Sequence, residues 1–221
     1  MLNIKSKLSS INDICHVMYI NMDYRPDRLE HAQSELSKVG LFDMATRFSG
    51  IIDSTKNGAI GCTRSHIECL KFARDNKWNH VLICEDDITF LDPEIFKNHL
   101  DKFLHSKFPW DVVLLGGNLI PPFVHINKSC VKIVGGCQTT TGYIVNGAYL
   151  DTLIANMEEG LDNLRLNPSN TTQYAIDRNW IKLQRIGHWY IIIPLTVSQY
   201  TNYSDIEDKV VDYTSKLVRI I

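Results

Sequence analysis

Three adjacent acidic residues, Glu85-Asp86-Asp87, directly follow the short apolar run Val81-Leu82-Ile83-Cys84. An apolar run of this length that ends in charge is typical of a buried strand, so the acids stand at its exit. Ligands of α/β proteins bind at such strand ends, and three crowded carboxylates repel one another until a cation binds. Mg²⁺ and Mn²⁺ prefer carboxylate oxygens and keep open positions for substrate phosphates. The cluster therefore indicates a metal site for a pyrophosphate-bearing donor, with a solvated turn as the alternative.

The surrounding sequence alternates apolar runs with segments of helical period. In the first half, Pro26 opens a helical stretch that Gly40 closes, and Thr63 or Ser65 can cap a second helix that runs to about residue 76. The pattern predicts strands over 15–21, 45–49, 81–85 and 110–115, with helices over 26–39 and 93–104. The second half is less regular, with strands expected over 130–134, 139–145 and 188–197 and a helix over 147–157.

This βαβα order predicts an α/β fold, a Rossmann-type mixed sheet that is mostly parallel, with helices on both faces. A chain of 221 residues without a linker or low-complexity tract fits one domain that spans residues 1–221. Within it we distinguish a first half over about 15–118, a second half over about 119–206 and a C-terminal tail over 207–221.

The composition limits the classes of binding partner and the cellular compartment that we expect for the protein. A formal net charge of −2 argues against electrostatic binding of nucleic acid or of an anionic membrane. No signal peptide or membrane-spanning run is recognisable, so we expect a cytoplasmic protein, either free or attached to a membrane through a partner. The six cysteines form no C-x-x-C pair, and Cys15 and Cys84 lie in apolar runs. Buried free thiols in a reducing compartment are therefore expected.

Four ordered blocks then resemble glycosyltransferase family 25, the lipooligosaccharide and collagen galactosyltransferase family. Residues 19–28 are similar to the family's opening I-N-L-D-R-R-x-D-R, and residues 58–66 are similar to G-E-I-G-C-x-x-S-H. Glu85-Asp86-Asp87 matches its strand-terminal E-D-D. The fourth block combines Thr141-Gly142-Tyr143, similar to T-x-A-Y, with Gln199 and Ser204-Asp205-Ile206, similar to a closing Q…S-D-I.

The resemblance implies a GT-A-like fold, with a nucleotide-sugar-binding first half and an acceptor-side second half. It also implies Mn²⁺ or Mg²⁺ as cofactor, UDP-galactose or UDP-glucose as donor, and a glycan or glycoprotein acceptor. Asp87 is the expected metal ligand. Glu85 is assigned either to the metal, directly or through water, or to donor hydroxyls, and Asp86 to the donor.

The other blocks supply candidate donor contacts. Amide, carboxylate and guanidinium groups at the exit of the first strand can bind a base, a ribose or a phosphate. The turn 58–61 and the following helix start offer backbone donors to a diphosphate. For Arg28 a solvated helix face is an equal alternative, and His66 could be an ordinary packed histidine. The donor set is Asn21, Asp23, Arg25, Arg28, Gly61, Ser65, His66, Glu85, Asp86, Thr141 and Tyr143, and the acceptor or closing-loop set is Gln199, Ser204 and Asp205.

An inverting transfer, expected from the family, needs a base that deprotonates the acceptor hydroxyl. Asp177 is the best candidate, although an aspartate entering a helical stretch can equally be an N-cap. Asp151 and Asp205 are reserve candidates, and His188 is either a second metal ligand or, more simply, a buried structural histidine. Most second-half aromatic residues are expected in the core, with one or two at the acceptor site: Trp180, Trp189, Tyr143, Tyr190, Tyr200 and Tyr203.

The leading hypothesis is therefore a metal-dependent, inverting hexosyltransferase that moves galactose or glucose to a hydroxyl of a glycan or of a hydroxylated protein. A non-catalytic nucleotide-sugar or glycan-binding module with the same fold is the alternative. Three crowded carboxylates argue against the module, which has no need of them. A Rossmann-type oxidoreductase is disfavoured because no G-x-G-x-x-G follows the first strand.

Overall fold

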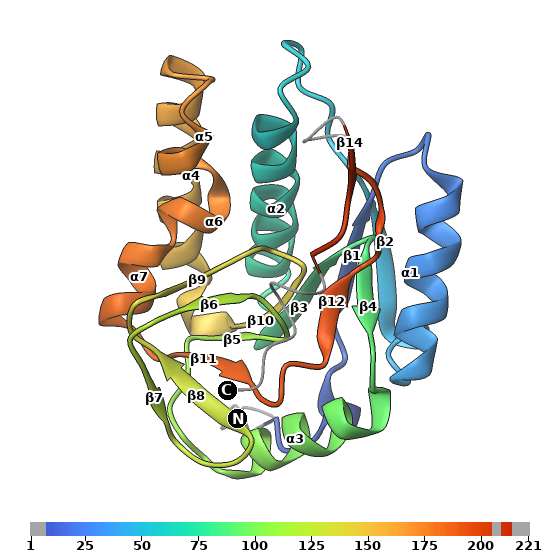
Figure 1. Cartoon of the computed structure of the whole chain (residues 1–221), viewed down its shortest axis with the longest axis vertical. Helices are drawn as coiled ribbons and strands as arrows, with labels where there is room; N and C mark the ends of the chain where they lie inside the picture. The colour runs from blue at the N-terminus through green and yellow to red at the C-terminus, as the bar shows by residue number, and fades with distance from the viewer. Residues whose placement is uncertain (1–7, 205–208, 214–221) are drawn as a thin grey trace.

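A computed structural model describes residues 8–204 and 209–213, which form one eight-stranded sheet with helices on both faces (Figure 1). Six strands run in one direction, and only β10 and β8 run against them. The expected α/β fold with a mixed, mostly parallel sheet is thus confirmed. In sheet order the strands are β2 (Ala45–Ser49), β1 (Val17–Asn21), β3 (His80–Glu85), β10 (Gly142–Asn146), β5 (Val112–Leu114), β11 (Trp189–Ile192), β8 (Cys130–Ile133) and β7 (Phe123–His125).

Three two-stranded ladders lie beside this sheet and were not expected from the sequence. Each pairs three-residue strands that are too short to show a clear alternation of polar and apolar residues. They are β4 (Ile88–Phe90) with β12 (Val197–Gln199), β6 (Asn118–Ile120) with β9 (Gly136–Gln138), and β13 (Asn202–Ser204) with β14 (Lys209–Val211).

The long helices form two layers that cover opposite faces of the sheet (Figure 1). One layer contains α2 (Gly58–Asp75) and α4 (Leu150–Leu166), and the other contains α1 (Pro26–Lys38) and α3 (Pro93–His105). Three short helices follow α4: α5 (Thr171–Tyr174), α6 (Ile176–Asn179) and α7 (Ile181–Ile186). Single 3₁₀ turns occupy Ile11–Asp13, Phe42–Met44 and Gly147–Tyr149. No helix among the described residues is both long and apolar enough to cross a bilayer.

Strand β3 shows how the two-residue period builds a core on each face. Val81 and Ile83 pack with the α2 and α4 layer, whereas Leu82 and Cys84 pack with the α1 and α3 layer, and all four are fully buried. A strand buried on both faces must be apolar throughout, which explains the continuous run in the sequence. The same alternation directs Glu85, the next residue, toward α2.

Helix α2 begins earlier than the sequence indicated. It starts at Gly58, because the Asn57 side chain accepts a hydrogen bond from the Ile60 N–H at 3.1 Å. The predicted caps at Thr63 and Ser65 are therefore wrong, since both hydroxyls donate to carbonyls one turn back within the helix. Residues 58–61 consequently form the first helical turn and not a loop.

Two predictions of burial also fail. The exposed Cys15 lies just before β1, so it is not a buried thiol, whereas Cys84 is buried as expected. His188 is exposed beside Asp111, and neither a structural core position nor a metal site fits it. The aromatic prediction holds for four rings: Trp180, Trp189, Tyr143 and Tyr190 are buried in the core.

Candidate active site

A cavity of about 830 Å³ opens where the parallel strands β2, β1 and β3 end. All three acids of the Glu85-Asp86-Asp87 cluster line it, as do residues of α2, α6 and the segment after β12. Segments far apart in the sequence thus meet at the strand ends, where α/β folds bind ligands. The three carboxylates point to three different sets of partners.

Asp86 is held by the exit of β1 and by α1. Its carboxylate accepts hydrogen bonds from Asn21 Nδ2 at 2.8 Å and from Arg28 Nη1 at 2.9 Å. The Asn21 oxygen in turn accepts from Arg47 Nε at 2.9 Å, so the amide is fully engaged within the protein. Burial raises the pKa of Asp86 against the opposing charge of Arg28. Asn21 does not line the cavity itself but holds Asp86, which does, through a buried network.

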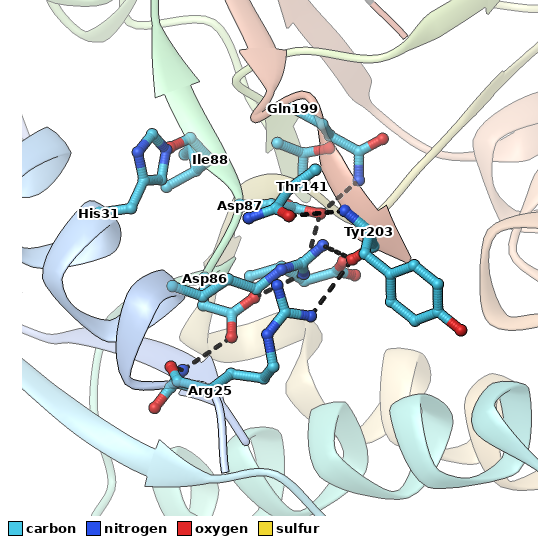
Figure 2. Close-up of polar contacts among 12 residues, drawn as sticks. Arg25, His31, Asp86, Asp87, Ile88, Thr141, Gln199 and Tyr203 are labelled. Carbon is cyan, nitrogen blue, oxygen red and sulfur yellow. Dashed lines mark hydrogen bonds and ion pairs between the residues drawn. The ribbon is translucent and has the colours of Figure 1, made fainter. Parts of the chain in front are cut away.

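Arg28 faces the acids and is not on a solvated helix face, although it lies on α1. One guanidinium nitrogen is 2.9 Å from Asp86 Oδ1 and 3.5 Å from Asp87 Oδ2. The other donates to the backbone oxygen of Tyr203 at 3.1 Å. Arg25 donates to that same oxygen at 3.2 Å and pairs with Asp27. The two arginines thus join the strand exit to the β13 segment, and Figure 2 labels Arg25 and Tyr203.

Asp87 is the least satisfied of the three acids. Its Oδ2 accepts a hydrogen bond from Gln199 Nε2 at 3.2 Å, and Figure 2 shows the Gln199 amide directed at this carboxylate. Its Oδ1 is buried and has no hydrogen-bond partner among the residues that the structure describes. Burial and, next, the charge of Glu85 raise the pKa of Asp87 to about 8, with Arg28 opposing them. A buried, unpaired carboxylate oxygen is costly, and a hard cation would satisfy it.

Glu85 lies on the α2 side, in a tight polar cluster. His66 Nε2 is 3.2 Å from Glu85 Oε1, the Cys62 thiol donates to the same oxygen at 3.9 Å, and the Thr140 hydroxyl also donates to it. Burial alone would raise the pKa of Glu85, but the hydrogen bond and charge of His66 outweigh it and hold the pKa below its ordinary value. On the far side of the ring, His66 Nδ1 is 2.8 Å from the Tyr143 hydroxyl.

Asp177 lines the same cavity, close enough to Glu85 for the two charges to interact. It lies in the first turn of α6, whose N-cap position is Ala175, so the alternative of a helix N-cap is wrong. Its carboxylate instead accepts a hydrogen bond from the Thr139 N–H at 3.0 Å. Burial raises the pKa of Asp177, which moves a carboxylate toward the range in which a general base works.

The remaining predicted residues divide by position. Gly61, Ser65, Gln199 and Ser204 line the cavity, and so does Tyr200, one of the two aromatics left outside the core. Ser65 also accepts a hydrogen bond from the Ile51 N–H at 2.8 Å, which fixes the wall after β2. The lining does not include Asn21, Asp23, Arg25, Thr141, Tyr143, Asp151 or His188. Asp205 lies outside the described residues.

Each residue outside the lining has a local reason for its place. Asp23 is exposed and pairs with Arg47 at 2.6 Å, and the exposed Asp151 faces Arg74 at 3.7 Å. Thr141 turns away from the cavity because Thr139, with a φ of 80°, reorients the backbone just before β10 begins. The Thr141 hydroxyl bonds to that of Thr139 at 2.6 Å, and Thr140 faces Glu85 in its place.

Cys62 is the main site residue that the sequence interpretation missed. No role was predicted for its thiol, yet it lines the cavity four residues before His66 on α2. Residues four apart share one face of a helix, so the Cys62–His66 spacing was the signal that could have found it.

Comparisons with known proteins support one family and show the fold. The model of glycosyltransferase family 25 (LPS biosynthesis protein) matches residues 53–161, which include α2, the acid cluster and β10. No curated protein matches the chain by sequence. A glycosyltransferase involved in glycosylation of the major capsid of PBCV-1 has a similar fold, with a TM-score of 0.51, 10% identity, and coverage of 89% of this chain and 91% of that one.

Two further solved structures are more distant. The mannose-1-phosphate geranyltransferase of Thermus thermophilus has a TM-score of 0.43 and 11% identity, over 80% of this chain and 73% of that one. The Drosophila β-1,4-galactosyltransferase 7, in complex with manganese, UDP-Gal and xylobiose, has a TM-score of 0.34 and 13% identity, over 62% and 52%. The match of the family model across the helix, the acid strand and β10 is the decisive finding: over these residues the chain is similar to glycosyltransferase family 25, which supports a glycosyltransferase.

Proposed function

We propose that this glycosyltransferase is metal-dependent and inverting, and that it transfers galactose or glucose from a UDP-sugar to a hydroxyl of a glycan or of a hydroxylated protein. One observation carries the proposal: within the described part of the chain Asp87 Oδ1 is buried without a partner beside Glu85, at a strand end that opens into a cavity of about 830 Å³. That arrangement leaves negative charge unsatisfied where a donor diphosphate would lie.

The residues present fit a hard divalent cation such as Mn²⁺ or Mg²⁺. Asp87 would hold it through its unpaired oxygen, and Glu85 would assist directly or through water. When bound, the cation would neutralise charge on the departing nucleoside diphosphate. Gln199 holds the other oxygen of Asp87 and so fixes the orientation of the carboxylate before a donor arrives.

Asp177 is the proposed general base. It would take the proton of the acceptor hydroxyl as the oxygen forms a bond to the anomeric carbon of the sugar. The bond from that carbon to the diphosphate oxygen breaks, and its electron pair leaves with the nucleoside diphosphate. Its place in the lining of the same cavity would let it reach an acceptor hydroxyl held next to the donor. The hydrogen bond from the Thr139 N–H keeps the Asp177 carboxylate in place.

Transfer assays with labelled UDP-galactose and UDP-glucose, with Mn²⁺ and a panel of glycan and hydroxylated peptide acceptors, test the proposal. We expect product from the wild type, and a loss of roughly 10²- to 10⁴-fold in kcat for Asp177→Asn with donor binding retained. Asp151→Asn is the matched control, because this exposed carboxylate lies outside the cavity and should leave kcat unchanged.

A thermal-shift measurement with the same nucleotide sugars separates transfer from mere binding. Donor-dependent stabilisation without product on any acceptor would support the non-catalytic binding module. No shift with any uridine nucleotide, with or without Mn²⁺, would refute the proposed donor.

A further inference from the structure

The α2-side wall of the cavity carries a cluster of which the proposed transfer uses only Glu85. Cys62, His66 and Glu85 present a sulfur, a nitrogen and a carboxylate oxygen within 4.8 Å of one another. Among the residues that the structure describes, no other three His, Cys, Asp or Glu side chains meet this closely. Cys62 and His66 project from the same face of α2, and Glu85 reaches them from the end of β3.

The spacing of these atoms suits a tetrahedral ion. Zinc bonds of about 2.0–2.3 Å place neighbouring ligand atoms roughly 3.3–3.8 Å apart. Here Glu85 Oε1 is 3.2 Å from His66 Nε2 and 3.9 Å from Cys62 Sγ. Hydrogens of the imidazole and the thiol now fill the space between these atoms, so an ion could replace them with only small side-chain shifts.

The second ring nitrogen of His66 has a polar partner, as is usual for histidines that bind metals. His66 is fully buried, and its Nδ1 lies 2.8 Å from the hydroxyl of the equally buried Tyr143. A hydroxyl can accept as well as donate, so Tyr143 can receive an Nδ1–H when Nε2 turns its lone pair to an ion. Such a partner on the second nitrogen fixes the orientation and tautomer of ligating histidines.

We propose that Cys62, His66 and Glu85 form a second cation site, selective for zinc-class ions, that shares Glu85 with the hard-cation site at Asp87. Thiolate and imidazole favour Zn²⁺ over Mg²⁺ or Mn²⁺, which prefer oxygen ligands. On binding, the Cys62 S–H bond breaks, its proton passes to solvent and the sulfur electron pair forms the bond to the ion. A water or a substrate oxygen would complete the fourth position.

The sharing of Glu85 gives the site a regulatory consequence, which rests on the proposed metal-dependent function. An ion that engages Glu85 from the α2 side draws this carboxylate away from Asp87 and occupies the cavity wall. We therefore expect zinc-class ions to inhibit transfer and Mn²⁺ in excess to relieve the inhibition.

The binding test uses Co²⁺ as a spectroscopic substitute for zinc and needs no activity. Titration of the metal-free protein should produce a thiolate-to-cobalt charge-transfer band that saturates at one equivalent and disappears when Zn²⁺ is added. The band should be lost in Cys62→Ser and retained in Asp87→Asn, which removes a ligand of the other site only. Circular dichroism and the unfolding midpoint establish that each variant is folded.

Cys15→Ser is the matched control, because the exposed Cys15 thiol also lies beside an imidazole, 3.9 Å from His80 Nε2. We expect the band to persist in this variant. A band that survives Cys62→Ser but vanishes in Cys15→Ser would overturn the assignment, as would the absence of any thiolate band in the wild type. His66→Asn, if folded, should weaken binding at least about tenfold. Failure of transfer assays alone would leave these spectra unaffected, so the two proposals fail separately.

Discussion

Replacement of Asp87 by asparagine should make the metal-free protein more stable while it abolishes turnover. The carboxylate is buried next to two other acids. Among the described residues one of its oxygens has no partner, and Arg28 and Gln199 oppose its charge. Asparagine keeps the shape and removes the charge. Its amide can still accept the hydrogen bond from Gln199, so the closing segment need not move.

The size of the effect follows from the pKa of Asp87, which burial raises from 3.8 to about 8. The folded state thus binds a proton more readily than the unfolded state, and stability falls as the pH rises from about 4 to about 8. At pH 7 the difference of about three units corresponds to at most about 4 kcal/mol. The buried amide N–H that replaces the unpaired oxygen costs about 1–3 kcal/mol. We expect a net gain of about 1–3 kcal/mol, or several degrees in Tm.

Urea unfolding in a chelator, followed by circular dichroism between pH 4 and pH 8.5, measures this difference. The advantage of Asp87→Asn should be smallest near pH 4 and should grow toward pH 8. Mn²⁺ should then stabilise the wild type but not the variant, because only the wild type retains the ligand. Asp151→Asn, at an exposed position, should change stability by less than about 0.5 kcal/mol. If Asp87→Asn is less stable than the wild type at pH 8 without metal, the picture of an unsatisfied buried charge is wrong.

Three further predictions concern the framework of the site. Gly61→Ala should destabilise the protein by about 1–3 kcal/mol and weaken donor binding, because a Cβ at this position would overlap the carbonyl oxygen of Ile51. Urea unfolding measures the change in stability. An unchanged unfolding midpoint would contradict the close approach of Gly61 to Ile51. Asn57→Ala should cost about 1 kcal/mol, measured the same way, because the cap on Ile60 N–H is lost. Burial, and then the charge of His16, lower the pKa of His80 to about 4. His80 should therefore stay neutral in the folded state while it becomes protonated in the unfolded state. The free energy of unfolding should fall by about 2 kcal/mol from pH 6.5 to pH 4. His80→Gln should flatten this part of the stability curve, and an equal slope in the variant would refute the assignment.

Much of the first half could be predicted because its strands are buried on both faces and its helices carry local boundary signals. Strand β2 was predicted with its observed bounds, and α1 begins at Pro26 as expected. The start of α2 could not be found in this way, since two glycines in four residues resemble a turn. The helix forms there because Asn57 caps it and Gly61 lets it pack against the backbone at Ile51. That second cause is a tertiary contact, which local sequence does not contain.

The site shows the same division between local pattern and three-dimensional arrangement. The acid cluster, His66, Asp177 and Gln199 were predicted from sequence, and the structure brings them to one cavity. The choice between Thr140 and Thr141 was not accessible, because it depends on the left-handed backbone at Thr139. Short strands such as β4 and β12 pair residues more than 100 positions apart, so no local pattern predicts their ladder.

The three acids differ in what surrounds them, and this difference explains how one short motif can serve several roles. Asp86 is neutralised within the protein by Asn21 and Arg28, so it fixes the backbone of the turn. Glu85 is ionised against His66 and joins the α2 wall to the acids. Asp87 alone keeps an unsatisfied oxygen. The charges of the neighbouring carboxylates destabilise the folded protein at this oxygen, and a bound cation would remove that repulsion. The free energy of folding that the site loses without metal is therefore regained when a cation binds. Cation affinity should accordingly increase with the number of acids that remain charged.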